Sequence, residues 1–187
     1  MSDGPPAWFE TVSSEVAYTG FSEVVVDTVR APDGSTVERE IVLHDDAVAV
    51  VPVLPDGRVL LLKQYRQALR GHLLEIPAGK MDVAGESPEQ VAHRELAEET
   101  GHAAAELRWL TTFHNSAGWT TERTHVFLGT DLHQVAPPEG FVARAEEAAM
   151  ELVPFRVEDL LDAVHGGQIT DGKTVIGVLL AAPQLRP

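Results

Sequence analysis

Apolar and polar residues alternate along two stretches in the first half of the chain. Residues 21–43 alternate on both sides of the sequence Ala-Pro-Asp-Gly at 31–34, and residues 47–65 do so around Pro-Asp-Gly at 55–57. Alternation with a period of two indicates strands, and these Pro/Gly sequences are typical of turns. We therefore predict two hairpins, preceded by a loose lead-in over residues 1–15 and followed by a short strand that ends at Pro77.

The second half of the chain contains both the period-two alternation of strands and the spacing of apolar residues that is typical of helices. Residues 105–113, 123–132 and 150–155 are predicted to be strands, whereas 157–167 and 171–182 have the spacing of helices. The segment 133–148 is rich in proline and acidic residues, which favours a mobile loop. Strands with a central and two terminal helices predict an α+β or mixed α/β fold. No linker divides the chain, so we expect one domain over residues 1–187, with a β-rich subregion at about 1–45.

A central helix has clear start and stop signals. Ser87 suits the N-cap, Pro88 the first helical position, and Gln90 completes the spacing of a capping box. Gly101 suits the left-handed residue that ends many helices. These signals predict a helix over 88–100.

Glutamates interrupt the apolar side of this helix. Glu95 and Glu99 are one turn apart and share a stripe with Val91 and Ala92, and Glu98 is close to it. Burial of unpaired carboxylates is costly, so either a cation neutralises them or this is a solvated acidic face. Oxygen ligands without cysteine favour Mg²⁺ or Mn²⁺ over zinc. The geometry alone leaves both interpretations open.

The overall charge limits the classes of partner. The chain has 14 Lys and Arg residues against 29 Asp and Glu, a formal charge of −15, and no cysteine. Without clustered basic residues we expect no nucleic-acid partner, although a small anion is compatible if metal ions supply positive charge. The N-terminus does not resemble a signal peptide, and no apolar run reaches membrane-spanning length. We therefore expect a cytoplasmic protein without a membrane partner.

The segment around the helix resembles the Nudix box. That motif is a glycine, five residues, a glutamate, seven residues, then Arg-Glu-U-x-Glu-Glu-x-Gly-U, where U is aliphatic. Gly79 and Glu86 match its start, and residues 94–101 (Arg-Glu-Leu-Ala-Glu-Glu-Thr-Gly) match its end. Two departures are an extra residue between Gly79 and Glu86 and His102 at the last position.

The resemblance implies a Nudix fold, a mixed β-sheet sandwiched between helices, with the Nudix core over about residues 46–187. It also implies hydrolysis of a nucleoside diphosphate linked to another group, with Mg²⁺ or Mn²⁺ as cofactor. By position, the resemblance implies that Glu95 and Glu99 are the main metal ligands and that Glu98 and Glu86 support them or bind further ions. In related pyrophosphatases, the backbone carbonyl at the position of Ala78 often joins the metal shell.

Catalytic roles also follow from the resemblance. Arg94 is expected to orient the glutamates, with Glu98 assisting. The general base of similar pyrophosphatases is a glutamate in a mobile loop before a late strand, a position occupied here by Glu146 and Glu147. A solvated acidic loop is the alternative for this pair. The motif does not distinguish which of the two acts.

Much of the chain is similar to the ADP-ribose pyrophosphatase subfamily, whose products are AMP and ribose 5-phosphate. The resemblance implies a homodimer built with the N-terminal strands. Arg39 and Arg66 are candidates for contacting base or phosphates, with a strand-edge ion pair as the alternative. Glu75 and Glu122 are further candidates for holding the substrate.

The identity of the substrate stays open at one point of the sequence. The subfamily usually has Pro-Gly downstream of the box, where this chain has Ala117-Gly118. GDP-mannose or another nucleoside diphosphate sugar is therefore an alternative substrate, and a sensor that binds without hydrolysis is a second alternative. We expect the neighbouring Trp119 to pack in the core or a loop, with stacking on a base as the alternative.

Overall fold

The computed structural model describes residues 8–138, 140–143, 145 and 147–185. Two compact units divide the chain: the first comprises residues up to 45 together with 114–122, and the second comprises 46–113 and the residues from 123 onward. The expectation that all 187 residues act as one domain stays a prediction. Within the described residues, no helix is long and apolar enough to cross a membrane.

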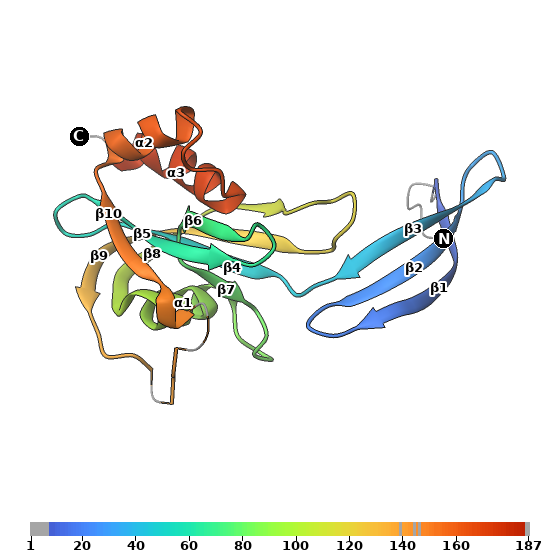
Figure 1. Cartoon of the computed structure of the whole chain (residues 1–187), viewed down its shortest axis with the longest axis horizontal. Coiled ribbons are helices and arrows are strands. Elements are labelled where there is room, and N and C mark those ends of the chain that lie inside the picture. Colours follow the sequence, from blue (N-terminus) through green and yellow to red (C-terminus); the bar gives the residue numbers. More distant parts are fainter. Residues whose placement is uncertain (1–7, 139, 144, 146, 186–187) are drawn as a thin grey trace, which may run out of the picture. The chain divides into compact units, whose positions relative to one another are not determined.

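The first unit is an antiparallel sheet of three strands in the order β1-β2-β3 (Figure 1). The strands are β1 (Glu10–Thr19), β2 (Glu23–Arg30) and β3 (Thr36–Leu43). The hairpin predicted around 31–34 is confirmed, and Gly34 provides the left-handed residue of its turn, with φ +83°. The predicted lead-in over 1–15 is wrong from Glu10 onward, because β1 pairs with β2 along its length.

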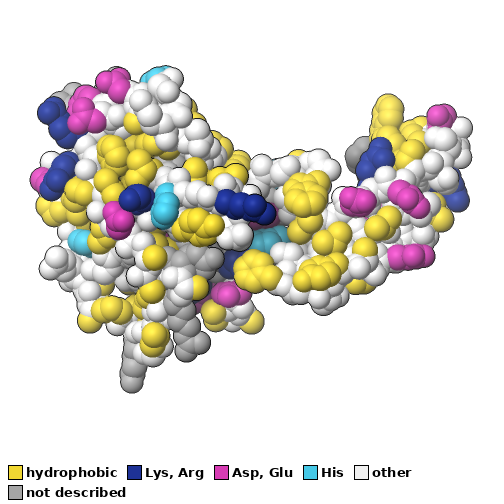
Figure 2. All heavy atoms as spheres, viewed as in Figure 1, with side chains coloured by type: hydrophobic (Ala, Val, Ile, Leu, Met, Phe, Trp, Pro, Cys, Tyr) yellow, Lys and Arg dark blue, Asp and Glu magenta, His cyan; other side chains and the backbone are white. Residues whose placement is uncertain are grey.

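Apolar side chains are exposed on this first unit, as Figure 2 shows. All ten residues of β1 are exposed, and the large apolar side chains among the exposed residues of the unit include Trp8, Phe9, Val16, Tyr18 and Phe21. An exposed apolar surface of this kind is typical of interaction sites.

In its described residues, the second unit contains seven strands and three α-helices. The elements are β4 (Ala47–Pro52), β5 (Val59–Arg66), β6 (Gly71–Glu75), β7 (Ala78–Lys80), α1 (Pro88–Thr100), β8 (His102–His114, whose last residue belongs to the first unit), β9 (Arg123–Gln134), the 3₁₀ helix η1 (Glu147–Ala149), β10 (Glu151–Phe155), α2 (Val157–His165) and α3 (Gly172–Leu185). The hairpin around 55–57 and the predicted helices are confirmed, whereas β7 was not predicted.

A mixed sheet in the order β7-β4-β9-β8 forms the centre of this unit. β4 runs parallel to β9 and antiparallel to β7. β4 is buried along nearly its whole length because its alternate residues enter two different cores: Val48 and Val50 contact the core beneath α1, and Ala49 and Val51 the other. The expected mixed sheet between helices is thereby confirmed.

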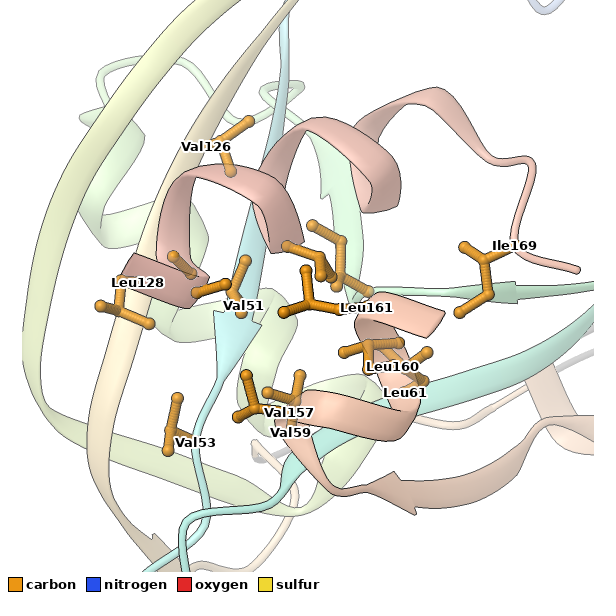
Figure 3. Packing of buried hydrophobic residues seen from close by; sticks show 14 of the residues in the cluster. Val51, Val53, Val59, Leu61, Val126, Leu128, Val157, Leu160, Leu161 and Ile169 are labelled. Carbon is orange, nitrogen blue, oxygen red and sulfur yellow. The ribbon is translucent and has the colours of Figure 1, made fainter. Parts of the chain in front are cut away.

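The larger core lies between this sheet, the β10-β5-β6 sheet and helices α2 and α3 (Figure 3). Leu160 and Leu161 of α2 point toward Leu61 of β5, and Val51 and Val126 come from the central sheet. α1 covers the opposite face of the central sheet, with Val91 and Leu96 fully buried. The two cores hold β4, and with it the adjacent β7, between packed layers.

One glycine allows α3 to approach the central sheet closely. A Cβ atom on Gly177 would lie 2.8 Å from Cγ2 of Val51 and 3.1 Å from Cδ1 of Ile76. Both neighbours are buried, so neither has room to move without disturbing the larger core.

We therefore expect Gly177→Ala to lower the free energy of unfolding by about 1–2 kcal/mol, because overpacking exceeds the gain in helix propensity. Gly172→Ala, in open space at the start of the same helix, is the matched control and is expected to be neutral or slightly stabilising. Urea denaturation measures both. Equal stability of the two variants would contradict the close packing.

Candidate active site

The strand β7, the loop after it and helix α1 carry the predicted Nudix box. Ser87 caps α1 as predicted: its hydroxyl accepts from the Gln90 N–H at 3.3 Å, and the Gln90 side chain accepts from the Ser87 N–H at 2.8 Å. Gly101 ends the helix with φ +67°. Both ends of α1 are thus fixed by local chemistry, which fixes the rotation of its glutamates.

Glu95 lies directly against the backbone of β7. A Cβ atom on Gly79 would lie 1.9 Å from Cδ of Glu95, so only glycine fits opposite this carboxyl group. The Glu95 side chain is only 12% exposed, and its Oε1 accepts from Nη1 of Arg94 at 2.6 Å. The prediction that Glu95 lies on the buried side of the helix is confirmed, and the glycine of the box has a steric reason.

Glu99 contacts the same strand one turn further along the helix. Its Oε2 accepts from the backbone N–H of Ala78 at 2.8 Å. In an antiparallel pair of strands, residues whose backbone groups point toward the neighbouring strand alternate with residues whose backbone groups point away from it. The Val50 N–H donates to the Pro77 carbonyl, so the backbone groups of the next residue, Ala78, which pairs with Ala49, point away from β4. The carbonyl of Ala78 shares this outward direction with its N–H. It therefore opens toward the side of β7 on which Glu99 lies.

Burial changes the protonation of both carboxyl groups. It raises the pKa of Glu99 to about 8, against the opposing hydrogen bond from Ala78. It raises the pKa of Glu95 to about 7, although the positive charge of Arg94 acts in the opposite direction. Each ionised carboxylate also raises the pKa of a neighbouring one, as Glu95 does for Glu99. Burial is thus the main effect that disfavours the charged form of both carboxyl groups.

Arg94 contacts three glutamates, Glu86, Glu95 and Glu98, which together form the acidic cluster. It donates to Glu86 at 3.2 Å, to Glu95 at 2.6 Å and to Glu98 at 3.3 Å, and its Nη2 reaches the carbonyl of Lys80 at 3.2 Å. Glu86, Glu95 and Glu98 are thus brought together as expected, and Arg94 orients all three. Glu99 is the exception, since Ala78 rather than Arg94 contacts it.

The donors fit a hard divalent cation in their chemistry. Glu95, Glu99 and the outward carbonyl of Ala78 offer oxygen atoms only, as Mg²⁺ and Mn²⁺ prefer. Across the described residues, however, no group of three or more His, Asp or Glu side chains is gathered in a geometry that holds a metal ion. Arg94 contacts Oε1 of Glu95 and the Ala78 N–H contacts Oε2 of Glu99, and each carboxylate has a second oxygen atom that can face a cation.

Arg66 and Glu75 form a bidentate ion pair beside this strand. Nε and Nη2 of Arg66 donate to Glu75 at 2.8 and 2.6 Å, and Glu75 is 1% exposed. Lys173 also donates to Glu75, and at 3.0 Å to Asp171. Although burial raises the pKa of Glu75, Arg66 and Lys173 hold it below its ordinary value. The ion-pair interpretation of Arg66 is confirmed, and a role in substrate binding stays a prediction.

Lys173 and Asp171 were missed by the sequence analysis. An aspartate at the start of the helix predicted over 171–182 was the available signal, because aspartate is a favoured N-cap residue. The partner of Lys173 was not accessible in this way, since Glu75 is 98 residues away in the chain.

Arg39 and Glu122 belong to the first unit. The Arg39 side chain donates to the carbonyl of Glu38 and, with Trp119, lines an open cavity of about 570 Å³. Trp119 is 56% exposed and lies in the turn before β9, so of the expected core or loop position the core is wrong. Glu122 lies 3.7 Å from Nδ1 of His44.

The two candidates for the general base fall at the limit of the described chain. Glu146 lies outside the described residues. Glu147 begins η1, and its side chain also lies outside the described part. Their assignment as base stays a prediction.

Comparison with known proteins agrees with the resemblance to the Nudix family. Residues 43–172 match the NUDIX domain. The chain is 38% identical over 172 residues to an ADP-ribose pyrophosphatase of Mycobacterium tuberculosis (91% of this chain, 82% of the relative). It is 36% identical over 170 residues to an ADP-ribose pyrophosphatase of Bacillus subtilis (90% of each).

The fold agrees with a solved structure described as an ADP compounds hydrolase, with a TM-score of 0.83, 20% identity, and coverage of 95% of this chain and 94% of that one. A mixed sheet between helices with carboxylates on a capped helix defines a Nudix-type hydrolase fold. This chain belongs to the NUDIX domain family. Hydrolases of this family generally need divalent metal ions.

In metal-free protein, we expect Glu99→Gln to gain stability relative to the original chain as the pH rises. The pKa of Glu99 is about 8 in the folded chain against an ordinary value of 4.5. The stability contributed by its neutral form is complete below about pH 4.5 and is lost as the pH rises through about 8. Glutamine does not titrate and still accepts from Ala78.

Urea denaturation at pH 5, 7 and 9 in the presence of a chelator measures this difference. Glu106→Gln, at an exposed position of β8, is the control. A difference between the Glu99→Gln and original proteins that stays constant from pH 5 to pH 9 would rule out the burial effect.

Proposed function

We propose that this chain hydrolyses the pyrophosphate bond of ADP-ribose, giving AMP and ribose 5-phosphate with the help of Mg²⁺ or Mn²⁺. The observation that carries the proposal is the pair of buried carboxyl groups, Glu95 and Glu99, with raised pKa values beside the open backbone of β7. The names of two relatives that cover most of the chain support the choice of substrate.

The proposed metal ligands are the carbonyl of Ala78 and the carboxylates of Glu95 and Glu99, with Glu98 and Glu86 as supporting or additional ligands. A divalent cation bound there supplies charge neutralisation for the diphosphate and a lowered pKa for water. Burial supports this assignment, because carboxylates that burial keeps protonated near neutral pH gain most from added positive charge.

Arg94 is proposed to hold the acidic cluster in place. It already contacts Glu86, Glu95 and Glu98, so it can keep one carboxylate while another turns toward a cation. Glu98 is proposed to assist catalysis from this cluster. Arg94 thereby limits the repulsion between like charges that are one helical turn apart.

A glutamate of the loop before β10 is proposed as the general base. Glu146 or Glu147 would accept the proton of the attacking water as its oxygen bonds to phosphorus and the bond to the leaving phosphate breaks. The support is positional: the pair follows a Pro/Gly-rich segment and precedes a late strand, as in similar pyrophosphatases.

Substrate-binding residues are proposed for each unit by itself. Arg39 and Trp119 line an open cavity with charged and aromatic groups, which suits a base or a phosphate. In the second unit, Arg66 and Glu75 are proposed to bind substrate. Glu122, in the first unit, is a further candidate for substrate binding. We also propose a homodimer formed through the N-terminal strands, which is supported by the apolar side chains exposed there.

GDP-mannose is the second candidate substrate, because Ala117-Gly118 replaces the Pro-Gly that is usual in the ADP-ribose subfamily. A sensor without hydrolytic activity is disfavoured because all the glutamates of the box are present. A panel of ADP-ribose, GDP-mannose, NADH, diadenosine polyphosphates and oxidised nucleotides with Mg²⁺ separates these functions. Heat protection by one compound without hydrolysis would favour the sensor.

Glu95→Gln and Glu99→Gln are each expected to lower kcat/KM for ADP-ribose on the order of 10²–10³-fold, since either change removes a negative charge needed by the cation. His93→Gln, on the exposed side of the same helix, is the matched control and is expected to retain activity. Released phosphate groups are assayed after phosphatase treatment. Full activity of Glu99→Gln would overturn the metal assignment.

A further inference from the structure

The backbone segment between β6 and β7 is anchored at four successive residues. The Glu75 side chain is held by Arg66 and Lys173, and the Ile76 N–H donates to Oγ1 of Thr174 at 2.9 Å. The next carbonyl, of Pro77, accepts from β4, and the N–H after it, of Ala78, donates to Glu99. The segment is thus fixed between the N-terminus of α3 and the acidic helix.

The N-terminus of α3 is itself tightly organised around Asp171. Oδ2 of Asp171 accepts from the Thr174 N–H at 2.9 Å and from its hydroxyl at 2.6 Å, and Oδ1 accepts from Lys173 at 3.0 Å. Thr174 is fully buried, and the Lys173 side chain is 14% exposed. The Thr174 hydroxyl donates to Asp171 while it accepts from Ile76, so it has no hydrogen atom left for another acceptor.

We propose that Lys173 and Thr174 are positioning residues for the carboxylate site. They hold Glu75 and Ile76 so that Ala78, two residues further, keeps its N–H on Glu99 and its carbonyl on the same side of the strand. The inference rests on the proposed function for its catalytic consequence, but the geometric part concerns only contacts of the second unit.

The charges around Glu75 support an effect of Lys173 on Ala78 that passes through the backbone of residues 75–78. Lys173 bridges two carboxylates, Asp171 and the buried Glu75 that is already paired with Arg66, so two cations balance two carboxylates. Without it, a buried carboxylate and Asp171 would each lose a partner, and the segment would move to find new ones. Reacting groups and their supports need placement within about 0.5 Å, so a small shift of the segment is enough to disturb the site.

The charge of Lys173 and the hydroxyl of Thr174 are tested by separate variants. Lys173→Met keeps the unbranched stem and removes the charge, and Thr174→Val keeps the shape and removes the hydroxyl. Thr174→Ser and Lys173→Arg are the conservative variants that should restore the contacts. Lys63→Met removes another lysine from an ion pair, at the exposed contact with Glu151, and is the matched control.

Three readouts are compared at a temperature well below the unfolding transition. Calorimetry measures Mn²⁺ binding without substrate, and steady-state kinetics with Mg²⁺ and ADP-ribose separate kcat from KM. Hydrogen exchange without metal reports on the backbone amides of residues 75, 76 and 78–80, since Pro77 has no N–H. We expect Lys173→Met and Thr174→Val to weaken Mn²⁺ binding by about 10- to 100-fold. They should also lower kcat more than they change KM, and speed exchange at Ala78.

The outcomes separate this proposal from the proposed function. A wild-type protein that hydrolyses none of the panel, with faster exchange at Ala78 in both variants and recovery in Thr174→Ser, would contradict the function and support positioning. Wild-type activity with unchanged kcat, Mn²⁺ binding and exchange in the two variants would overturn positioning and leave the function intact. Variants that only unfold at lower temperature, like a purely structural change, would also overturn it.

Discussion

The contact between α1 and β7 is the constraint on which the rest of the site depends. Glu95 occupies the space that a side chain on Gly79 would fill, and Glu99 accepts from Ala78. Two carboxyl groups are thereby placed where burial opposes their ionisation. Burial therefore disfavours the charged form of both carboxyl groups in the metal-free protein, a cost that the cation proposed for this site would reduce.

Two hydrophobic cores make this unfavourable contact tolerable. β4 is packed between these two cores, and β7, which carries Ala78 and Gly79, is held in place by its antiparallel pairing with β4. The core beneath α1 contains Val91, Ala92 and Leu96, which alternate along the helix with the acidic residues. The same burial that stabilises the helix against the sheet therefore desolvates its glutamates. The packing of α1 on the sheet therefore both stabilises the fold and raises the pKa of the buried glutamates.

The sequence predicted the features that short-range chemistry determines. The cap at Ser87, the end at Gly101 and the buried side of Glu95 depend on residues within one or two turns, so periodicity and spacing were sufficient. β7 was missed because three residues after a proline carry no periodicity. The Lys173–Glu75 contact was missed because tertiary packing joins residues that are 98 positions apart. β1 was missed because its side chains are exposed on both faces, so it has no buried stripe.

The two departures from the Nudix pattern lie where the structure can absorb them. The extra residue falls in the loop before α1, where Gly85 has φ +88° and the Glu86 N–H closes a turn on the Val83 carbonyl. Glu86 still reaches Arg94 at 3.2 Å. His102 begins β8, and its Nδ1 lies 2.8 Å from the carbonyl of Thr100. Because the cap at Ser87 restarts the helical register after the loop, neither departure rotates the carboxylates away from β7.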